Sequence, residues 1–124
     1  MTTGINLNEP AIFYLIEHPV FRAGKVGIGA QSAVRVESHK RNGWTVHLQI
    51  DLETGELAYE LERRILYWIR KDLLLPKFLG KEEMPQRGET ETFAIDGLSI
   101  TDAKRKIKSV LETIRLEAAA NRDS

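Results

Sequence analysis

The feature that most constrains the fold is an uninterrupted apolar run over residues 11–16, AIFYLI, near the N-terminus. The run is rich in β-branched and aromatic side chains, and turn-forming residues follow at 19–24, so it predicts a buried strand that ends in a turn. Residues 25–30 are then predicted to form the partner strand of a hairpin. We therefore expect a sheet built on this hairpin.

A short helix and a third strand are predicted after the hairpin. Ser32 is a suitable N-cap, and Asn42-Gly43 a suitable end, for a helix over residues 33–41. From residue 44 to residue 52 apolar and polar side chains alternate with a period of two. That alternation is typical of a strand with one buried face.

Two longer helices complete the predicted set of elements. The first follows a turn at residues 54–55, because apolar side chains recur at helical spacing from there to Leu73. An irregular loop is expected over residues 77–90. The second helix begins after a cap at Ser99 or Thr101, and its apolar stripe is expected to pack on the same domain or on a partner.

These elements predict an α+β fold, within the broad α/β class, with the order β-β-α-β-α-loop-α. The sheet is expected to have three mostly antiparallel strands flanked by helices. With 124 residues, 42% of them hydrophobic and 29% charged, the chain has the length and composition of one globular domain. We assign residues 1–98 to this domain and residues 99–124 to a C-terminal amphipathic helix.

Composition also bears on the cellular compartment. The chain has no cysteine, which excludes a disulfide framework and a thiolate zinc site and fits a reducing compartment. No apolar run approaches the roughly 18 residues of a membrane span, and residues 1–10 have no signal-peptide pattern. We expect a cytoplasmic protein without a membrane partner.

The charges are balanced in number but unevenly distributed along the chain. The formal net charge is zero. Residues 20–47 carry five basic and one acidic side chain, a net charge of +4, whereas residues 51–62 carry five acidic side chains and no basic one. A neutral total therefore leaves room for a basic face and an acidic face. Ordinary solvated charges would give the same counts.

Five polar residues are candidates for chemistry on phosphodiesters. Tyr14 and Lys25 lie on adjacent predicted strands. Arg35 and His39 are four residues apart on the short helix, so they project from nearly the same side. Glu91 follows the loop, where a return of the chain to the sheet would bring its carboxylate to the same place. Phosphodiester hydrolysis requires an activated water, positive charge near the phosphate and help for the leaving oxygen, and these side chains include a candidate for each task.

The spacing of these residues resembles that of a GIY-YIG nuclease domain over residues 11–98. The first signature of that family corresponds to residues 12–14 (IFY) and the second to residues 25–27 (KVG), with ten residues between them. Arg35 follows the glycine of the second motif by eight positions, and His39 follows the arginine by four. Four residue types at matching spacings are difficult to obtain by chance.

The downstream part of the resemblance is the segment at residues 88–93, which is similar to the one that carries the family's metal-binding glutamate. We align that glutamate with Glu91, and Glu89 is the alternative. Two positions depart from the family pattern: Ile12 stands in place of a glycine, and Lys25 in place of a tyrosine.

The resemblance implies a metal-dependent DNA endonuclease. Glu91 would bind Mg²⁺, with Mn²⁺ as a substitute, and Arg35 would clamp the scissile phosphate with its planar donor groups. Tyr14 would orient the attacking water, and either Tyr14 or His39 would take its proton. The residues expected to contact DNA are Lys25, Arg35, Lys40 and Arg41.

Two other interpretations fit the same sequence. A module with this fold that lost turnover through the replacement at Lys25 would bind nucleic acid without cutting it. A protein-interaction domain would instead use the acidic segment at residues 51–62. No separate DNA-reading domain fits in 124 residues, so double-stranded or branched DNA would be recognised by shape, or a homodimer or a targeting protein would supply the target.

Overall fold

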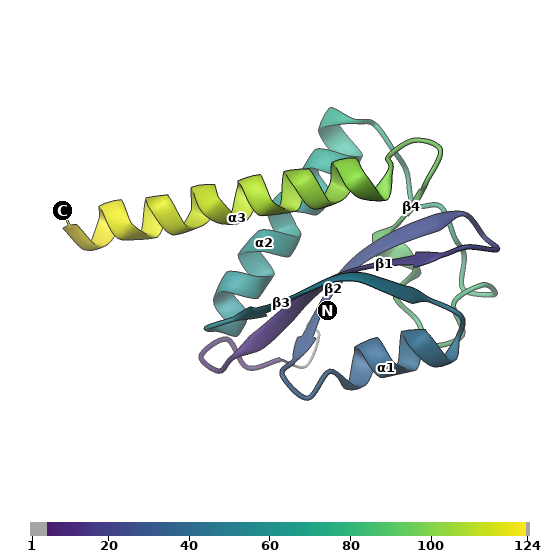
Figure 1. Cartoon of the computed structure of the whole chain (residues 1–124), viewed down its shortest axis with the longest axis horizontal. Coiled ribbons are helices and arrows are strands. Elements are labelled where there is room, and N and C mark those ends of the chain that lie inside the picture. Colours follow the sequence, from purple (N-terminus) through teal and green to yellow (C-terminus); the bar gives the residue numbers. More distant parts are fainter. Residues whose placement is uncertain (1–4, 124) are drawn as a thin grey trace.

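The computed structural model describes residues 5–123, which form a four-stranded antiparallel sheet with helices on both faces (Figure 1). Residues 1–4 of the N-terminal segment and residue 124 lie outside this range. Among the described residues no helix combines the length and the apolar character needed to cross a bilayer. The elements in chain order are β1 (Ala11–His18), β2 (Ala23–Ala30), α1 (Val34–Arg41), β3 (Thr45–Leu52), α2 (Gly55–Tyr67), the π-helical turn η1 (Trp68–Asp72), the 3-10 turn η2 (Glu89–Glu91), β4 (Thr92–Ala94) and α3 (Ile100–Asp123).

The sheet has the strand order β3-β1-β2-β4, and every neighbouring pair is antiparallel. The α+β class, the β1-β2 hairpin and the third strand are confirmed. The prediction of three strands is wrong, because β4 pairs with Ala23–Lys25 of β2 as a fourth strand. β4 has three residues, which is too short to show the alternation by which strands are recognised in a sequence.

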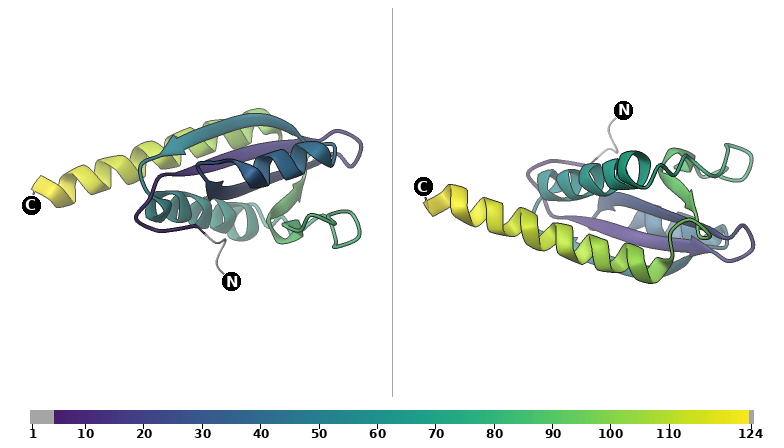
Figure 2. Two further views of the ribbon diagram at one scale, coloured as in Figure 1. Left: turned by 90° about the horizontal axis from the view of Figure 1, so that it is seen from below. Right: turned by 90° about the horizontal axis from the view of Figure 1, so that it is seen from above.

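Helices cover both faces of the sheet (Figures 1 and 2). α1 lies on one face, where Tyr14 of β1 shares a core with Val36 of α1. α2 and α3 lie on the other face, where Phe13 shares the larger core with Ile65 and Ile107. Successive side chains of a strand point to opposite faces, so β1 contributes to both cores. This double burial explains why residues 11–16 of β1 are apolar without interruption.

The ends of the helices agree with the sequence in part. The prediction that Ser32 caps α1 is wrong, because Ala33 occupies the N-cap position in a left-handed conformation (φ 61°) without a side-chain bond. The predicted end is confirmed: the Asn42 N–H donates to backbone carbonyls of α1, and Gly43 has a φ of 93°. Thr54 caps the start of α2: its hydroxyl oxygen accepts a bond of 3.2 Å from the backbone N–H of Leu57.

The helical segment that begins with α2 extends to Asp72, close to the predicted end at Leu73, but its last turn is a π-helix instead of an α-helix. α2 ends at Tyr67 and continues as the π turn η1, whose wider bond joins the Leu73 N–H to the Trp68 carbonyl at 2.9 Å. Apolar spacing does not distinguish these two kinds of winding. For α3 the cap is Ser99, whose hydroxyl oxygen accepts a bond of 3.1 Å from the Asp102 N–H.

The segment before η2 has little regular structure, as predicted, but it is fixed to the core. The hydroxyl oxygen of Thr92 accepts bonds from the N–H groups of Phe78 (3.2 Å) and Leu79 (3.0 Å). The Arg70 guanidinium donates to the carbonyl oxygens of Thr90 and Thr92, at 2.7 and 2.8 Å. The loop therefore returns to the sheet at a defined place.

α3 packs on the sheet with its first half, and its C-terminal end projects beyond the sheet (Figure 1). Its apolar stripe is part of the larger core. Leu116 lies on the exposed side of the helix, with 64% of its surface accessible. The buried residues of the stripe are Ala103, Ile107, Leu111 and Ile114.

The acidic segment at residues 51–62 does not form a uniformly negative surface. Glu53 pairs with Arg115 of α3 at 3.0 Å. Glu60 pairs with Arg63 and Arg64, which follow it on α2, at 2.7 and 2.6 Å. Because arginines neutralise these carboxylates, the segment gives little support to a protein-binding acidic face.

Candidate functional site

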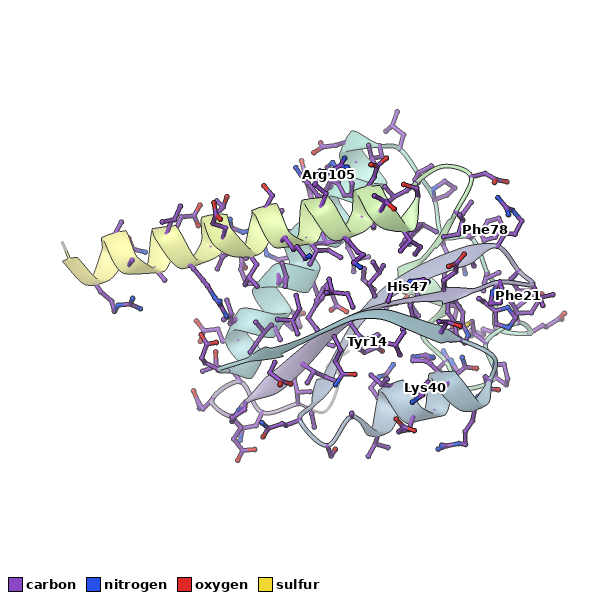
Figure 3. The ribbon with its side chains drawn as sticks, viewed as in Figure 1. Tyr14, Phe21, Lys40, His47, Phe78 and Arg105 are labelled. Atoms are coloured by element: carbon purple, nitrogen blue, oxygen red, sulfur yellow. The ribbon has the colours of Figure 1, made fainter. Side chains whose placement is uncertain are left out.

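The chain folds so that the five predicted residues lie close together. Tyr14 lies between the sheet and α1 (Figure 3). It pairs in register with Gly27, so Lys25, two residues earlier on β2, points to the same face. His39 is a buried residue of α1, and Arg35, one turn earlier on the same helix, interacts with the Tyr14 hydroxyl. η2 returns Glu91 to 3.9 Å from the Lys25 ammonium.

Tyr14 and His39 form a buried side-chain pair. The phenol oxygen lies 3.2 Å from Nε2 of His39, and the ring centroids are 5.7 Å apart. Burial raises the pKa of Tyr14 to about 12, although a hydrogen bond and the charge of Arg35 lower it. Burial, with the charges of Lys25 and Arg35, lowers the pKa of His39 to about 3. Both side chains are therefore neutral at pH 7.

Lys25 is completely buried beside Glu91. Its ammonium lies 3.9 Å from Oε1 of Glu91 and donates to the carbonyl oxygen of Val26 at 3.2 Å. Burial lowers the pKa of Lys25 to about 8, and the negative charge of Glu91 opposes this shift. Because the ammonium does not reach the surface, Lys25 can contact only a phosphate that enters the site.

Two glycines make room for these side chains. A Cβ on Gly27 would lie 2.3 Å from the phenol oxygen of Tyr14, and one on Gly88 would lie 2.8 Å from Cε of Lys25. Gly88 also has a φ of 102°, which other residues rarely adopt. The glycines of the second motif and of the downstream segment therefore have steric roles that spacing alone did not reveal.

A cavity of about 210 Å³ lies between α1 and the loop, next to this cluster. Two of its lining residues have a buried polar atom that finds no hydrogen-bond partner within residues 5–123: Nε of Arg35 and Oε1 of Gln86. Buried polar atoms are normally paired, so a donor and an acceptor are available to a ligand here. The lining residues are Val34, Arg35, Ser38, His39 and Gln86.

Comparison of the chain with models of known protein families, with curated proteins and with solved structures found no match. The site is therefore interpreted from its own chemistry. Within residues 5–123 no cluster of three or more histidine, cysteine, aspartate or glutamate side chains is arranged to hold a metal ion. A cation bound at the site would have fewer protein ligands, and water would complete its shell.

Glu91, rather than the alternative Glu89, is the carboxylate next to Lys25. Glu89 is buried and pairs instead with Arg87 at 3.4 Å. The side chain of Glu91 is 22% exposed, and its second oxygen accepts a bond from the hydroxyl of Thr90. One of its oxygens therefore faces the buried ammonium.

A second carboxylate at the site, Glu62 of α2, was not predicted from the sequence. Burial raises the pKa of Glu62 to about 7, the charge of Glu91 acts in the same direction, and the charges of Lys25 and Arg35 lower it. These interactions place Glu62 in the same electrostatic cluster. A signal was present in the sequence, because Glu62 interrupts the apolar stripe of α2 at helical spacing from Ala58 and Ile65. The sequence-based interpretation counted Glu62 only among the five acidic side chains of residues 51–62.

The surface around the site is basic on α1. Lys40, labelled in Figure 3, and Arg41 are both exposed. Lys40 pairs loosely with Glu37, at 3.4 Å, where both side chains are more than half accessible. Surface pairs of this kind are weak, so both cations are available to a phosphate on the surface.

Proposed function

We propose that the protein is a metal-dependent endonuclease that hydrolyses phosphodiester bonds in DNA, as the GIY-YIG nucleases do, whose motifs it resembles. The observation that carries the proposal is the close placement of ionisable side chains from β1, β2, α1, α2 and η2. Burying each of them costs free energy, and strongly shifted pKa values cluster at functional sites. The side chains are Tyr14, Lys25, Arg35, His39, Glu62 and Glu91.

The donor set fits a hard divalent cation. Glu62 and Glu91 offer carboxylate oxygens, and the charge of Glu91 helps to raise the pKa of Glu62. Mg²⁺ typically uses one or two carboxylates together with water and substrate phosphate, and Mn²⁺ accepts the same oxygens. When bound, such a cation supplies a Lewis acid that stabilises the leaving oxygen and acidifies a water molecule.

The other side chains bind and orient the phosphodiester. Nε of Arg35 is a donor without a partner, and a guanidinium binds phosphate through two parallel N–H groups. Tyr14 and His39 lie beside it, where one of them takes a proton from the attacking water. A pKa of about 3 makes His39 a weak proton acceptor, whereas Tyr14 is a strong base once it is ionised. Lys40 and Arg41 contact the flanking backbone phosphates.

Nicking of supercoiled plasmid tests the proposal. With Mg²⁺ or Mn²⁺ the purified protein should produce open-circular and then linear DNA, and EDTA should stop the reaction. Arg35→Gln and Glu91→Gln should each lower the rate by roughly 100-fold or more. Glu82→Gln, which removes an exposed carboxylate of the loop, is the matched control and should cut like the wild type. Intact plasmid with both metals, or equal cutting by Glu91→Gln, contradicts the proposal.

One observation favours a second function, nucleic-acid binding without cleavage. The Lys25 ammonium already supplies positive charge next to Glu91, where the nuclease would hold its cation. Such a module would retain DNA in a gel-shift assay with a steep dependence on salt, but would not nick plasmid. Calorimetric titration with Mn²⁺ separates the two functions, because the nuclease binds the ion in a manner that Glu91→Gln weakens, whereas the binding module does not bind it.

A further inference from the structure

The cavity of about 210 Å³ between α1 and the loop adjoins the catalytic cluster but is not lined by its carboxylates. Gln86 contributes to it from the loop, and Arg35, Ser38 and His39 contribute from α1. No acidic side chain of the described residues lines it. A water molecule takes roughly 30 Å³, so the cavity has room for a phosphate group. The polar atoms of its walls determine what it can bind.

The O–H of Tyr14 determines where His39 carries its proton. Burial raises the pKa of Tyr14 to about 12, so the phenol is neutral at pH 7. A buried O–H needs an acceptor, and the phenol oxygen lies 3.2 Å from Nε2 of His39. Arg35, which also interacts with the phenol, has only donors. Tyr14 therefore donates to Nε2. Because burial lowers the pKa of His39 to about 3, its neutral ring has one proton, which is on Nδ1.

The Nδ1–H of His39 in turn determines the orientation of the Gln86 amide. The amide Nε2 lies 3.1 Å from Nδ1, whereas Oε1 is buried and finds no partner within residues 5–123. Two N–H donors cannot pair with each other. A turn of the amide by 180° exchanges its NH₂ group and its oxygen with almost no change of shape. Oε1 then accepts from Nδ1–H, and the turn removes only a weak contact of Nε2 with the Met84 sulfur, at 3.6 Å.

The turned amide presents its NH₂ group to the cavity. Nε of Arg35, which is buried and has no partner within residues 5–123, is a second donor among the lining residues. The cavity is also positive, because the charges of Lys25 and Arg35 add to the effect of burial in lowering the pKa of His39. Two buried donors in a positive cavity without a carboxylate are suited to an oxyanion.

We propose that this cavity is a phosphate-binding subsite, in which the NH₂ group of Gln86 and Nε of Arg35 donate to the oxygens of one phosphate group. Tyr14 and Glu91 do not line the cavity, so this phosphate is a neighbour of the one that is cleaved. Inorganic phosphate and a phosphate of a nucleic-acid backbone offer the same oxygens. The subsite rests on contacts within the protein, whereas its occupation by a strand rests on the proposed nuclease function.

Arg35 connects the subsite to the catalytic cluster. Its interaction with Tyr14 runs through the terminal nitrogens of the guanidinium, because Nε has no partner. One guanidinium therefore holds two successive phosphates of a strand and positions the bond to be cleaved next to Tyr14. Gln86 contacts the strand but takes no proton from it. Its loss should weaken binding and leave the chemical step unchanged.

Nitrogen NMR tests the protonation of His39 without any ligand. In protein labelled with ¹⁵N-histidine, long-range correlations to the ring protons show which nitrogen of a neutral ring carries the proton. The chain has three histidines, so the His39 signals are those that remain in both His18→Gln and His47→Gln. We expect Nδ1–H as the predominant form at pH 7. Predominant Nε2–H, or an even mixture, overturns the proposal, because the amide would then present its oxygen to the cavity.

Titration with inorganic phosphate, and separately with the thymidine dinucleotide that has one phosphodiester, tests the subsite directly. The titrations are made at pH 7 in EDTA, with chloride keeping the ionic strength constant. The ¹⁵N signals of the Gln86 amide and of Nε of Arg35 should shift and saturate with both probes. No saturable shift with either probe overturns the proposal. A shift with phosphate alone supports the subsite and refutes its occupation by a strand.

Substitution of Gln86 tests its part in binding. Gln86→Glu keeps an acceptor for the Nδ1–H of His39 but places a carboxylate oxygen in the cavity, so it should weaken phosphate binding by roughly 10-fold or more. Gln86→Met removes the donor and should also weaken binding. Gln31→Glu makes the same change of charge in an exposed turn and should bind like the wild type. Unchanged affinity in both Gln86 variants overturns the proposal, and the second variant keeps the test informative if the first does not fold.

Kinetics separate the subsite from the nuclease function. If the plasmid assay detects nicking, Gln86→Glu should raise KM by roughly 10-fold while kcat stays nearly the same, as expected for a residue that only binds substrate. An unchanged KM would refute the contact of the strand with the cavity. A wild type that binds phosphate at Gln86 and nicks nothing would refute the nuclease function but not the subsite.

Discussion

The burial of Lys25 makes the stability of the folded chain depend on pH in an alkaline window. Its side chain is 0% exposed, and the ammonium contacts the Val26 carbonyl and the Glu91 carboxylate. Lys25→Met keeps an unbranched side chain of similar length and removes the titrating group. Comparison of the two proteins therefore isolates the effect of one ionisation on the free energy of unfolding.

The shift in the pKa of Lys25 gives the size and the sign of the change in the free energy of unfolding with pH. The pKa of Lys25 falls from 10.5 to about 8 on folding, because burial disfavours the ammonium. Between these values the unfolded chain binds a proton that the folded chain does not, so the free energy of unfolding rises with pH. A difference of roughly 2.5 pKa units corresponds to about 3 kcal/mol. Below pH 8 both states hold the proton and the contribution is constant.

Urea unfolding followed by tryptophan fluorescence, from pH 7 to 10.5 in EDTA, measures this rise. The difference between wild type and Lys25→Met should grow by about 3 kcal/mol in favour of the wild type across the window. Lys40→Met removes an exposed lysine of α1 and should give a curve parallel to that of the wild type. Two results would contradict this expectation. One is a Lys25→Met curve of unfolding free energy against pH that is parallel to the wild-type curve, and the other is a loss of wild-type stability as pH rises toward 10.

Three further changes have expected outcomes. Gly27→Ala forces a Cβ to 2.3 Å from the phenol oxygen of Tyr14 and should lower stability by about 1–3 kcal/mol in urea unfolding, whereas Gly29→Ala, with its nearest contact at 3.8 Å, should be tolerated. Arg70→Met removes three bonds, to the backbone carbonyls of Leu75, Thr90 and Thr92, on both sides of the loop. It should lower the melting temperature and speed limited digestion by trypsin within residues 77–90. Ile107→Ala opens a cavity at a fully buried position of α3 and should cost about 2–5 kcal/mol in the same unfolding assay.

Most of the secondary structure was predictable because each long element has a periodicity that buries one side. The apolar run at residues 11–16 required a strand between two cores, and both cores are present. β4 was missed because Thr92–Ala94 shows no period, and its pairing with β2 depends on where the loop returns. The start of α1 was misplaced because a left-handed Ala33 has no signature in the sequence.

The site residues were predictable where their spacing is local. Arg35 and His39 are four apart on one helix, so their common direction follows from helical geometry. Glu62 and Gln86 lie in segments without a motif, and their contacts with the site arise only from tertiary structure. The helical spacing of Glu62 from Ala58 and Ile65 indicated its buried side of α2, but its interaction with Glu91 arises only from the tertiary structure.

The continuous helical segment formed by α2 and η1 positions both Glu62 and Glu91. α2 carries Glu62 in its own buried stripe, and η1, which continues it, carries Arg70 about two turns later. Arg70 bonds the carbonyls of Thr90 and Thr92, the residues on either side of Glu91. The separation of the two carboxylates is therefore set by a continuous stretch of helical backbone and by the guanidinium that joins it to the loop. Because a cation held by two carboxylates would depend on their separation, this helix and Arg70 would fix the geometry of the proposed cation site.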